Sequence, residues 1–280
     1  MIKQRTIRRA VVIEGVGLHT GKKVTLALQG SPPGSGINFI RLDLPNKPLL
    51  NIQSLNLNDA ASAAHERRTV LGMGPLQIQT TEHLLAAFSG LGIDNIVAEL
   101  DNDELPGLDG SAKGFVDVIK KAGIEEQDAP KKFLKVKEPV WCRNEDRVIA
   151  ILPDDNFRIS YTMSYKNEAL GTRYFDIIID ENSFEKEIAP ARTFCLKSEA
   201  LMLAAMGLGR GAGWKNNLIM GKKGPIGNKL RFRDEPVRHK VLDLMGDLYL
   251  AGAALKGHVI SIKGGHNLNM EMVKILKGRI

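Results

Sequence analysis

Residues 234–249 read DEPVRHKVLDLMGDLY, which has the features of one long helix. Asp234 is a suitable N-cap, Pro236 belongs in a first helical turn, and no residue breaks the helix before Gly252. Apolar side chains cover most of the circumference of this helix. We therefore expect the helix to be buried on nearly all sides.

Three polar residues of this helix form one stripe. His239, Asp243 and Asp247 follow one another at intervals of four residues, which places them on one helix face. A solvated face is the usual explanation of such a charged run. The apolar surroundings favour a second interpretation, because unpaired buried charge is very costly. A divalent metal is a suitable partner, and Zn²⁺ accepts an imidazole and a carboxylate one helical turn apart.

A third metal ligand must come from elsewhere in the chain. The best candidate is His83 in the sequence TTEHLL, residues 80–85, with its neighbour Glu82 as general base. A helix is predicted here, with Thr80 or Thr81 as N-cap and Gly90 as its end. A Glu-His pair at a helix start also serves capping and dipole compensation, so both interpretations stay open.

His266 lies in the sequence IKGGHNLN, residues 262–269, where two glycines allow a sharp turn before a final helix. One interpretation is a surface histidine without a catalytic role. The other is a proton donor that stays protonated because a carboxylate such as Asp247 raises its pKa.

Two apolar or glycine-rich stretches complete the set of motifs. Residues 15–21, GVGLHTG, resemble a phosphate loop around His19 but lack its Lys-Ser/Thr ending. Residues 200–209, ALMLAAMGLG, include Leu201 and Leu203. They are interpreted either as a buried core helix or as the wall of a passage for an alkyl chain.

The clearest internal break is EEQDAPKK, residues 125–132, which is charged and lacks apolar periodicity. It predicts a first domain over residues 1–128 and a second over 129–280. In both halves strand-like runs precede helical ones, which favours an α+β class. The expected strands are 24–28, 95–100, 133–140, 147–152, 157–165 and 173–179, and a further helix is expected over 112–122 with its end at Gly123.

Composition and charge narrow the functional classes. With 43% hydrophobic residues and no biased tract, the chain is expected to be an ordered globular protein. Two cysteines are too few for a disulfide framework and favour a reducing compartment. Residues 1–9 do not resemble a signal peptide, and no apolar run is long enough to span a bilayer.

The formal charge of +7 and the pI near 9.3 favour anionic partners. Nucleic acid, phosphorylated metabolites and an acidic membrane surface all meet this condition. The few aromatic residues are not interleaved with basic ones as an RNA-binding platform requires. We therefore expect no nucleic-acid partner.

Seven segments in order along the chain resemble the UDP-3-O-acyl-N-acetylglucosamine deacetylase family, and the resemblance covers essentially the whole chain. The segments are GVGLHTG (15–21), TEHLLAA (81–87), GLGIDN (90–95), LDGSA (108–112), ARTF (191–194), VRHKVLD (237–243) and GHNLN (265–269). The family fold implies two similar domains, each a β-sheet with helices on one face, stacked so that the helices are sandwiched between the two sheets. It also implies an insertion, at about 196–229, that forms the acyl-chain passage.

The resemblance implies zinc-dependent hydrolysis of the N-acetyl group of UDP-3-O-(3-hydroxyacyl)-N-acetylglucosamine, the committed step of lipid A (lipopolysaccharide) biosynthesis. Zn²⁺ would be bound by His83, His239 and Asp243. Glu82 would be the base that activates water. Thr193 would donate a hydrogen bond to the oxyanion. His266 would be an imidazolium that protonates the leaving amine, and Asp247 would be the carboxylate that supports His266.

The resemblance also implies substrate contacts. Lys240 matches a lysine that contacts the diphosphate, and Tyr165 falls where an aromatic ring packs near the uridine. The remaining substrate-binding residues expected are Phe194, His19, Leu201 and Leu203. Two positions depart from the family pattern: Arg68 replaces a cysteine or small residue, and Cys195 replaces a small residue.

We expect the partner to be this small UDP-linked acylated amino sugar, and the protein to be a cytoplasmic monomer that can contact the inner face of the inner membrane. Two alternatives stay open. A zinc hydrolase for a different amide would keep the metal ligands but fail on the nucleotide substrate. A silent binding protein would bind the nucleotide sugar without turnover, although the presence of Glu82 and His266 speaks against it.

Overall fold

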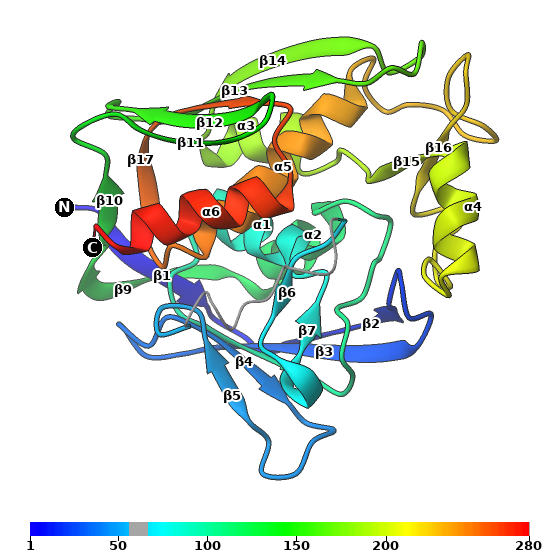
Figure 1. Cartoon of the computed structure of the whole chain (residues 1–280). Coiled ribbons are helices and arrows are strands. Elements are labelled where there is room, and N and C mark those ends of the chain that lie inside the picture. Colours follow the sequence, from blue (N-terminus) through cyan, green and yellow to red (C-terminus); the bar gives the residue numbers. More distant parts are fainter. Residues whose placement is uncertain (56–66, 280) are drawn as a thin grey trace.

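The computed structural model describes residues 1–55 and 67–279, and Figure 1 shows a mixed α+β architecture with two larger sheets. Among these residues the first sheet has five strands in the order β2-β3-β8-β4-β5. All its neighbouring strands are antiparallel except β4 and β8. The α+β class expected from the sequence is confirmed. The strands are β2 (Val11–Val16), β3 (Lys23–Gly30), β4 (Ile37–Arg41), β5 (Leu49–Asn51) and β8 (Ile96–Leu100).

The second sheet, formed within residues 133–262, has the order β11-β12-β17-β13-β14. The short strand β10 lies outside this order and pairs in parallel with the beginning of β17. Its strands are β10 (Phe133–Lys135), β11 (Val140–Asn144), β12 (Arg147–Leu152), β13 (Phe157–Ser164), β14 (Thr172–Ile178) and β17 (Ala254–Ile262). In the central strand β17, buried and partly exposed residues alternate. This period of two shows that one face of the sheet is covered.

The main helices lie between the two larger sheets in Figure 1. They are α1 (Glu82–Leu91), α2 (Lys113–Ala122), α5 (Glu235–Tyr249) and α6 (His266–Lys277). Helix α5 packs on β13 and β14 and α6 packs on β11 and β12, whereas α2 packs near β2. The largest helix–helix contact joins α1 to α5. This contact connects residues that are far apart in sequence and places the first turn of α1 in the centre of the molecule.

Helix α5 is buried along its length except at Arg238 and Lys240, as its apolar circumference predicted. One glycine lets α1 approach it closely. A Cβ atom on Gly246 would lie 2.0 Å from the carbonyl oxygen of Glu82, at the start of α1. The face of α5 that carries Gly246 therefore lies against the beginning of α1.

Two local predictions need correction. The helix end predicted at Gly90 is wrong, because α1 continues to Leu91 and is capped by Gly92, whose φ of +68° is in the left-handed region. The break at residues 125–132 is largely a strand: β9 (Ile124–Pro130) pairs with β1 (Lys3–Ile7). The domain boundary between residues 128 and 129 remains a prediction.

The segment predicted as an insertion begins with a small parallel pair. Strands β15 (Phe194–Leu196) and β16 (Leu218–Met220) pair with each other, and helix α4 (Lys197–Ala205) packs on both. No residue of α4 is buried, so the interpretation of residues 200–209 as a buried core helix is wrong. Figure 1 places α4 at one edge of the molecule, away from the helices between the sheets.

Short elements complete the described chain. They are β6 (Val70–Leu71), β7 (Ile78–Gln79), η2 (Gly74–Leu76), α3 (Glu181–Ser183) and η3 (Phe184–Ile188). None of the helices in the described ranges is long and apolar enough to cross a membrane.

Candidate active site

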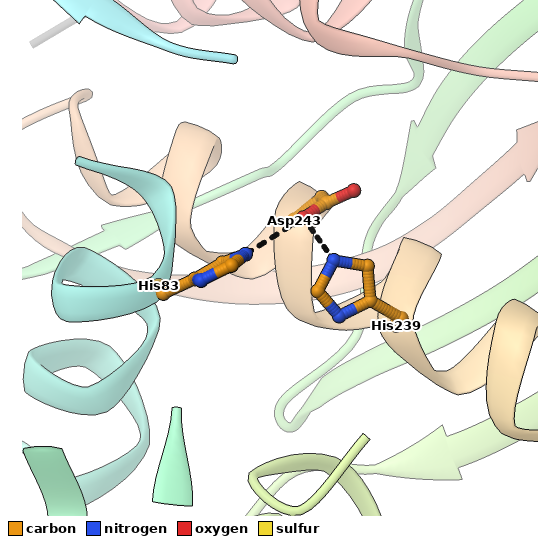
Figure 2. A group of neighbouring side chains, drawn as sticks. All are labelled: His83, His239 and Asp243. Carbon is orange, nitrogen blue, oxygen red and sulfur yellow. Dashed lines mark ion pairs between the residues drawn. The ribbon is translucent and has the colours of Figure 1, made fainter. Parts of the chain in front are cut away.

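Figure 2 shows His83 of α1 beside His239 and Asp243 of α5. The Nε2 atom of His239 lies 3.2 Å from Oδ1 of Asp243, and Nε2 of His83 lies 3.8 Å from the same oxygen. One donor atom from each residue lies within 4.8 Å of the other two, and all three side chains are buried. Two imidazole nitrogens and a carboxylate oxygen at this spacing fit a divalent metal such as Zn²⁺. The interpretation of the α5 stripe as a solvated face is therefore wrong.

The protonation states of these residues suit metal binding. Burial, together with the neighbouring imidazole of His239, lowers the pKa of His83 to about 3, so His83 is neutral at pH 7. Burial would raise the pKa of Asp243, but His239 and Lys240 outweigh it and hold that pKa well below its usual value. A metal ion would therefore meet a neutral imidazole and an ionised carboxylate, the forms that bind metals.

A hydrogen bond to the main chain orients His239. Its Nδ1 lies 2.9 Å from the carbonyl oxygen of Ala191. A carbonyl can only accept, so Nδ1 carries a proton, and Nε2, the nitrogen that faces Asp243, is the atom placed to bind a metal. Ala191 is followed by Arg192, whose guanidinium pairs with the fully buried Glu235 at 2.8 Å. This ion pair holds the segment that supplies the carbonyl against the start of α5.

Glu82 lies next to the metal-ligand set and is itself buried. The backbone amide of Thr69 donates to its Oε2 at 3.0 Å. Burial and the carboxylates of Asp243 and Asp247 raise the pKa of Glu82 to about 8, against the opposing effect of His266. A carboxyl group with a pKa near neutrality can both accept and return a proton at physiological pH.

His266 is buried rather than on the surface, so the interpretation as a surface histidine is wrong. Its Nδ1 lies 2.8 Å from Oδ2 of Asp247, which is fully buried. Burial alone would lower the pKa of His266, but Asp247 and Asp243 outweigh this effect and raise it to about 9. His266 is therefore an imidazolium at pH 7 that presents its Nε2 proton away from Asp247.

A cavity of about 580 Å³ joins these groups. The residues of the predicted site that line it are His19, Glu82, His83, Tyr165, Thr193, Phe194, Leu203, His239, Lys240, Asp243 and His266. Asp247 lies behind His266 and contacts it directly. Leu201 does not line the cavity, and 67% of its surface is exposed. The structure therefore brings most of the predicted residues together and leaves Leu201 outside.

Comparison with known proteins agrees with this geometry. The sequence model described as "UDP-3-O-acyl N-acetylglycosamine deacetylase" matches residues 4–277. The chain belongs to this deacetylase family. It is 40% identical over 282 residues to a UDP-3-O-acyl-N-acetylglucosamine deacetylase from Teredinibacter turnerae, a match that covers 100% of this chain and 91% of that relative. The resemblance drawn from the sequence motifs is confirmed, and with it the assignment to a family of hydrolytic enzymes.

Three of the residues expected to contact substrate, Tyr165, Phe194 and Lys240, lie close together in the cavity lining. The rings of Tyr165 and Phe194 meet edge to face, with their centroids 5.8 Å apart. The Nζ atom of Lys240 lies 5.8 Å from the centroid of Phe194 and 2.9 Å from Oδ2 of Asp243. The amide of Thr193 donates to the carbonyl of Gly110 at 2.7 Å, which fixes the backbone beside Phe194.

Two positions that depart from the deacetylase family pattern are buried. Cys195 lines the cavity, and Nδ2 of Asn217 lies 3.2 Å from its Sγ. Arg68 is 4% exposed, and its Nε has no hydrogen-bond partner in the described residues. Burial lowers the pKa of Arg68, and the charges of Glu104 and Glu82 oppose this. What Arg68 and Cys195 do to substrate choice stays a prediction.

Sequence reasoning missed two residues that hold the candidate catalytic groups Glu82, Asp247 and His266. Thr69 donates through its amide to Glu82, and its hydroxyl bonds to Asp247 and lies 3.1 Å from Nδ1 of His266. Asn269 donates from Nδ2 to Oδ2 of Asp247 at 2.7 Å. Asn269 lies in the family segment GHNLN, which was a signal for a role. Thr69 lies in no such segment, and only its position in space reveals it.

Proposed function

We propose that this chain hydrolyses the N-acetyl group of UDP-3-O-(3-hydroxyacyl)-N-acetylglucosamine to the free amine and acetate, with Zn²⁺ as its cofactor, in lipid A biosynthesis. The observation that carries the proposal is the convergence of Glu82 and His266 on one cavity with the metal-ligand set. Membership of the deacetylase family supports the same reaction.

The metal ligands in this proposal are His83, His239 and Asp243. When bound, Zn²⁺ would polarise the acetamide carbonyl and lower the pKa of water. The same donor set also accepts other divalent ions, so the metal content of the purified protein is part of the test.

Glu82 and His266 would move the protons of the reaction. As water adds to the acetamide carbon, Glu82 takes one of its protons, while the amide of Thr69 keeps the carboxylate in place. The C–N bond then breaks, and His266 gives its Nε2 proton to the leaving amine nitrogen. Asp247 holds His266 by its other ring nitrogen and stabilises the imidazolium before this transfer. Thr193 would donate to the oxyanion.

Substrate binding would follow the cavity wall. Lys240 would contact the diphosphate, Tyr165 and Phe194 would pack near the uridine, and His19 would close the cavity near the sugar. Leu203 would begin the passage for the acyl chain, because it is the residue of α4 with an apolar side chain in the cavity lining. One chain supplies all these groups, which supports a monomer as the active unit.

The test is release of free amine from this substrate by the purified chain, before and after chelation. Turnover that chelation abolishes, Zn²⁺ restores and Glu82→Gln reduces by about 1,000-fold would support both the reaction and the base. Glu14→Gln, on the exposed side of β2, is the matched control and should not change the rate. A folded, zinc-loaded chain without turnover would instead favour another amide substrate or a silent binder.

A further inference from the structure

The positive charge of the chain is concentrated in one segment. Residues 196–233 contain eight Lys or Arg residues and one Glu, a formal charge of +7 that equals that of the whole chain. The remainder of the sequence is therefore neutral overall. All eight basic side chains are exposed. Arg231 pairs with Asp109 at 2.8 Å, and the other seven form no ion pair with any described residue.

This charge does not serve the cavity. None of the eight basic residues lines it, and the cavity has cations of its own in Arg67, Arg147, Lys166, Lys240 and Lys263. These eight basic side chains therefore do not contact a substrate bound in the cavity, and their charge needs another explanation.

The same segment exposes large apolar side chains. Met202 and Met206 are 61% and 66% exposed, and Trp214 is 51% exposed. None of these three lines the cavity, although their neighbour Leu203 does. Helix α4 thus turns one apolar residue toward the site and others toward solvent. Exposed apolar groups gathered in one place commonly mark an interaction surface.

Hydrogen bonds hold the apolar and basic parts together. The amide of Ile226 donates to the carbonyl of Ile219 at 2.8 Å, which fixes the turn with Lys222 and Lys223 to strand β16. The side chain of Asn228 donates to the carbonyl of Trp214. Because α4 packs on β16, these parts are joined in one region at the edge of the molecule, where Figure 1 shows α4 and β16. We call it the α4 surface, made of Met202, Met206, Trp214, Lys215, Lys222 and Lys223.

We propose that the α4 surface docks the protein on an anionic lipid bilayer. Basic side chains near a bilayer are attracted by anionic headgroups, and neighbouring apolar side chains insert at the boundary of headgroups and acyl chains. Indole rings favour that boundary. The positive charge complements anionic headgroups, and the exposed methionines and tryptophan can insert among them. Nucleic acid would also attract the charge but would give the methionines no role. The proposal does not depend on the deacetylase reaction.

The test is flotation of the full chain with vesicles of equal parts phosphatidylglycerol and phosphatidylcholine, compared with pure phosphatidylcholine. Binding is expected only to the anionic vesicles. The Lys215→Gln/Lys222→Gln/Lys223→Gln variant should bind about 100-fold more weakly. Met202→Ser/Met206→Ser should bind at least roughly 10-fold more weakly.

A matched control removes the same charge elsewhere. Lys121→Gln/Lys132→Gln/Lys137→Gln alters three exposed lysines outside the α4 surface, and its binding should equal that of the unaltered chain. In a Trp141→Phe background, the fluorescence of Trp214 should shift to shorter wavelength on binding. Thermal melts confirm that each variant is folded.

Two results would overturn the proposal. One is absence of binding to anionic vesicles by the folded, unaltered chain. The other is equal loss of binding in the charge variant and in its matched control, because overall charge rather than the α4 surface would then explain the binding.

Discussion

Gly246 of α5 lies directly against the main chain of Glu82 in α1, so close that a Cβ atom there would be 2.0 Å from the Glu82 carbonyl oxygen. A glycine in the middle of a helix normally costs about 1 kcal/mol relative to alanine. Here it allows the helix that carries Glu82 and His83 to reach the helix that carries His239 and Asp243. The geometry of the site thus depends on a residue with no side chain.

Gly246→Ala should therefore damage both stability and activity. Overpacking at such a contact typically costs about 1–3 kcal/mol, and displacement of Glu82 should lower kcat at least roughly 10-fold. Urea denaturation and amine release measure the two effects. Gly213→Ala is the control, because no atom lies within 4 Å of its added Cβ. Unchanged stability and rate in Gly246→Ala would show that the helices can separate without harm.

Thr69→Val should impair catalysis while leaving metal binding intact. Valine keeps the shape and the backbone amide to Glu82, but it loses the hydroxyl that contacts Asp247 and His266. A buried partner left without its hydrogen bond costs about 1–3 kcal/mol, which corresponds to a fall in kcat of roughly 10- to 100-fold. Thr69→Ser should restore most of the rate. Zinc content by elemental analysis separates this effect from metal loss, and a full rate in Thr69→Val would argue against the role of the hydroxyl.

Zinc binding at pH 7 should release a proton from Glu82. In the metal-free chain the pKa of Glu82 is raised to about 8, so this carboxyl is mostly protonated at pH 7. A nearby cation favours the carboxylate and lowers the pKa, so the proton leaves. His83, with a pKa of about 3, and Asp243 have no proton to release. Calorimetric zinc titrations in two buffers of different ionisation enthalpy should show about one proton fewer in Glu82→Gln than in the unaltered chain. Equal release by both would contradict the assignment to Glu82.

Arg192→Met should be strongly destabilising. It would leave the fully buried carboxylate of Glu235 without its partner, and breaking a buried pair in this way costs about 3–5 kcal/mol. Arg158→Met is the comparison, because its pair with Asp176 is partly exposed and should contribute little to stability. The difference between the two free energies of unfolding measures the effect of burial, and similar values would contradict it.

The helices that carry the site were predictable because their signals are local. The apolar circumference of residues 234–249 indicated burial, and the interval of four residues placed His239 and Asp243 on one face. The helix of His83 was also predicted, apart from its last residue. What spacing alone left open was whether His83 meets the other two ligands, because that contact depends on how α1 packs on α5. The family resemblance supplied this step.

Other features depend on contacts that no local pattern encodes. The hydroxyl of Thr69 reaches Asp247, a residue 178 positions away in sequence. Residues 125–132 were interpreted as a break because they are charged, yet pairing with β1 makes most of them a strand. Helix α4 is apolar but not buried, because no other part of the described chain covers its outer side.

The split of the candidate metal ligands between α1 and α5 has a consequence for biosynthesis. A ribosome makes His83 long before it makes His239 and Asp243, so the emerging first half of the chain holds only one of the three candidate ligands, and a single imidazole binds a metal ion weakly. All three candidate ligands can meet one ion only when α5 has packed against α1. The site can therefore form only after both helices have been made and have packed against each other.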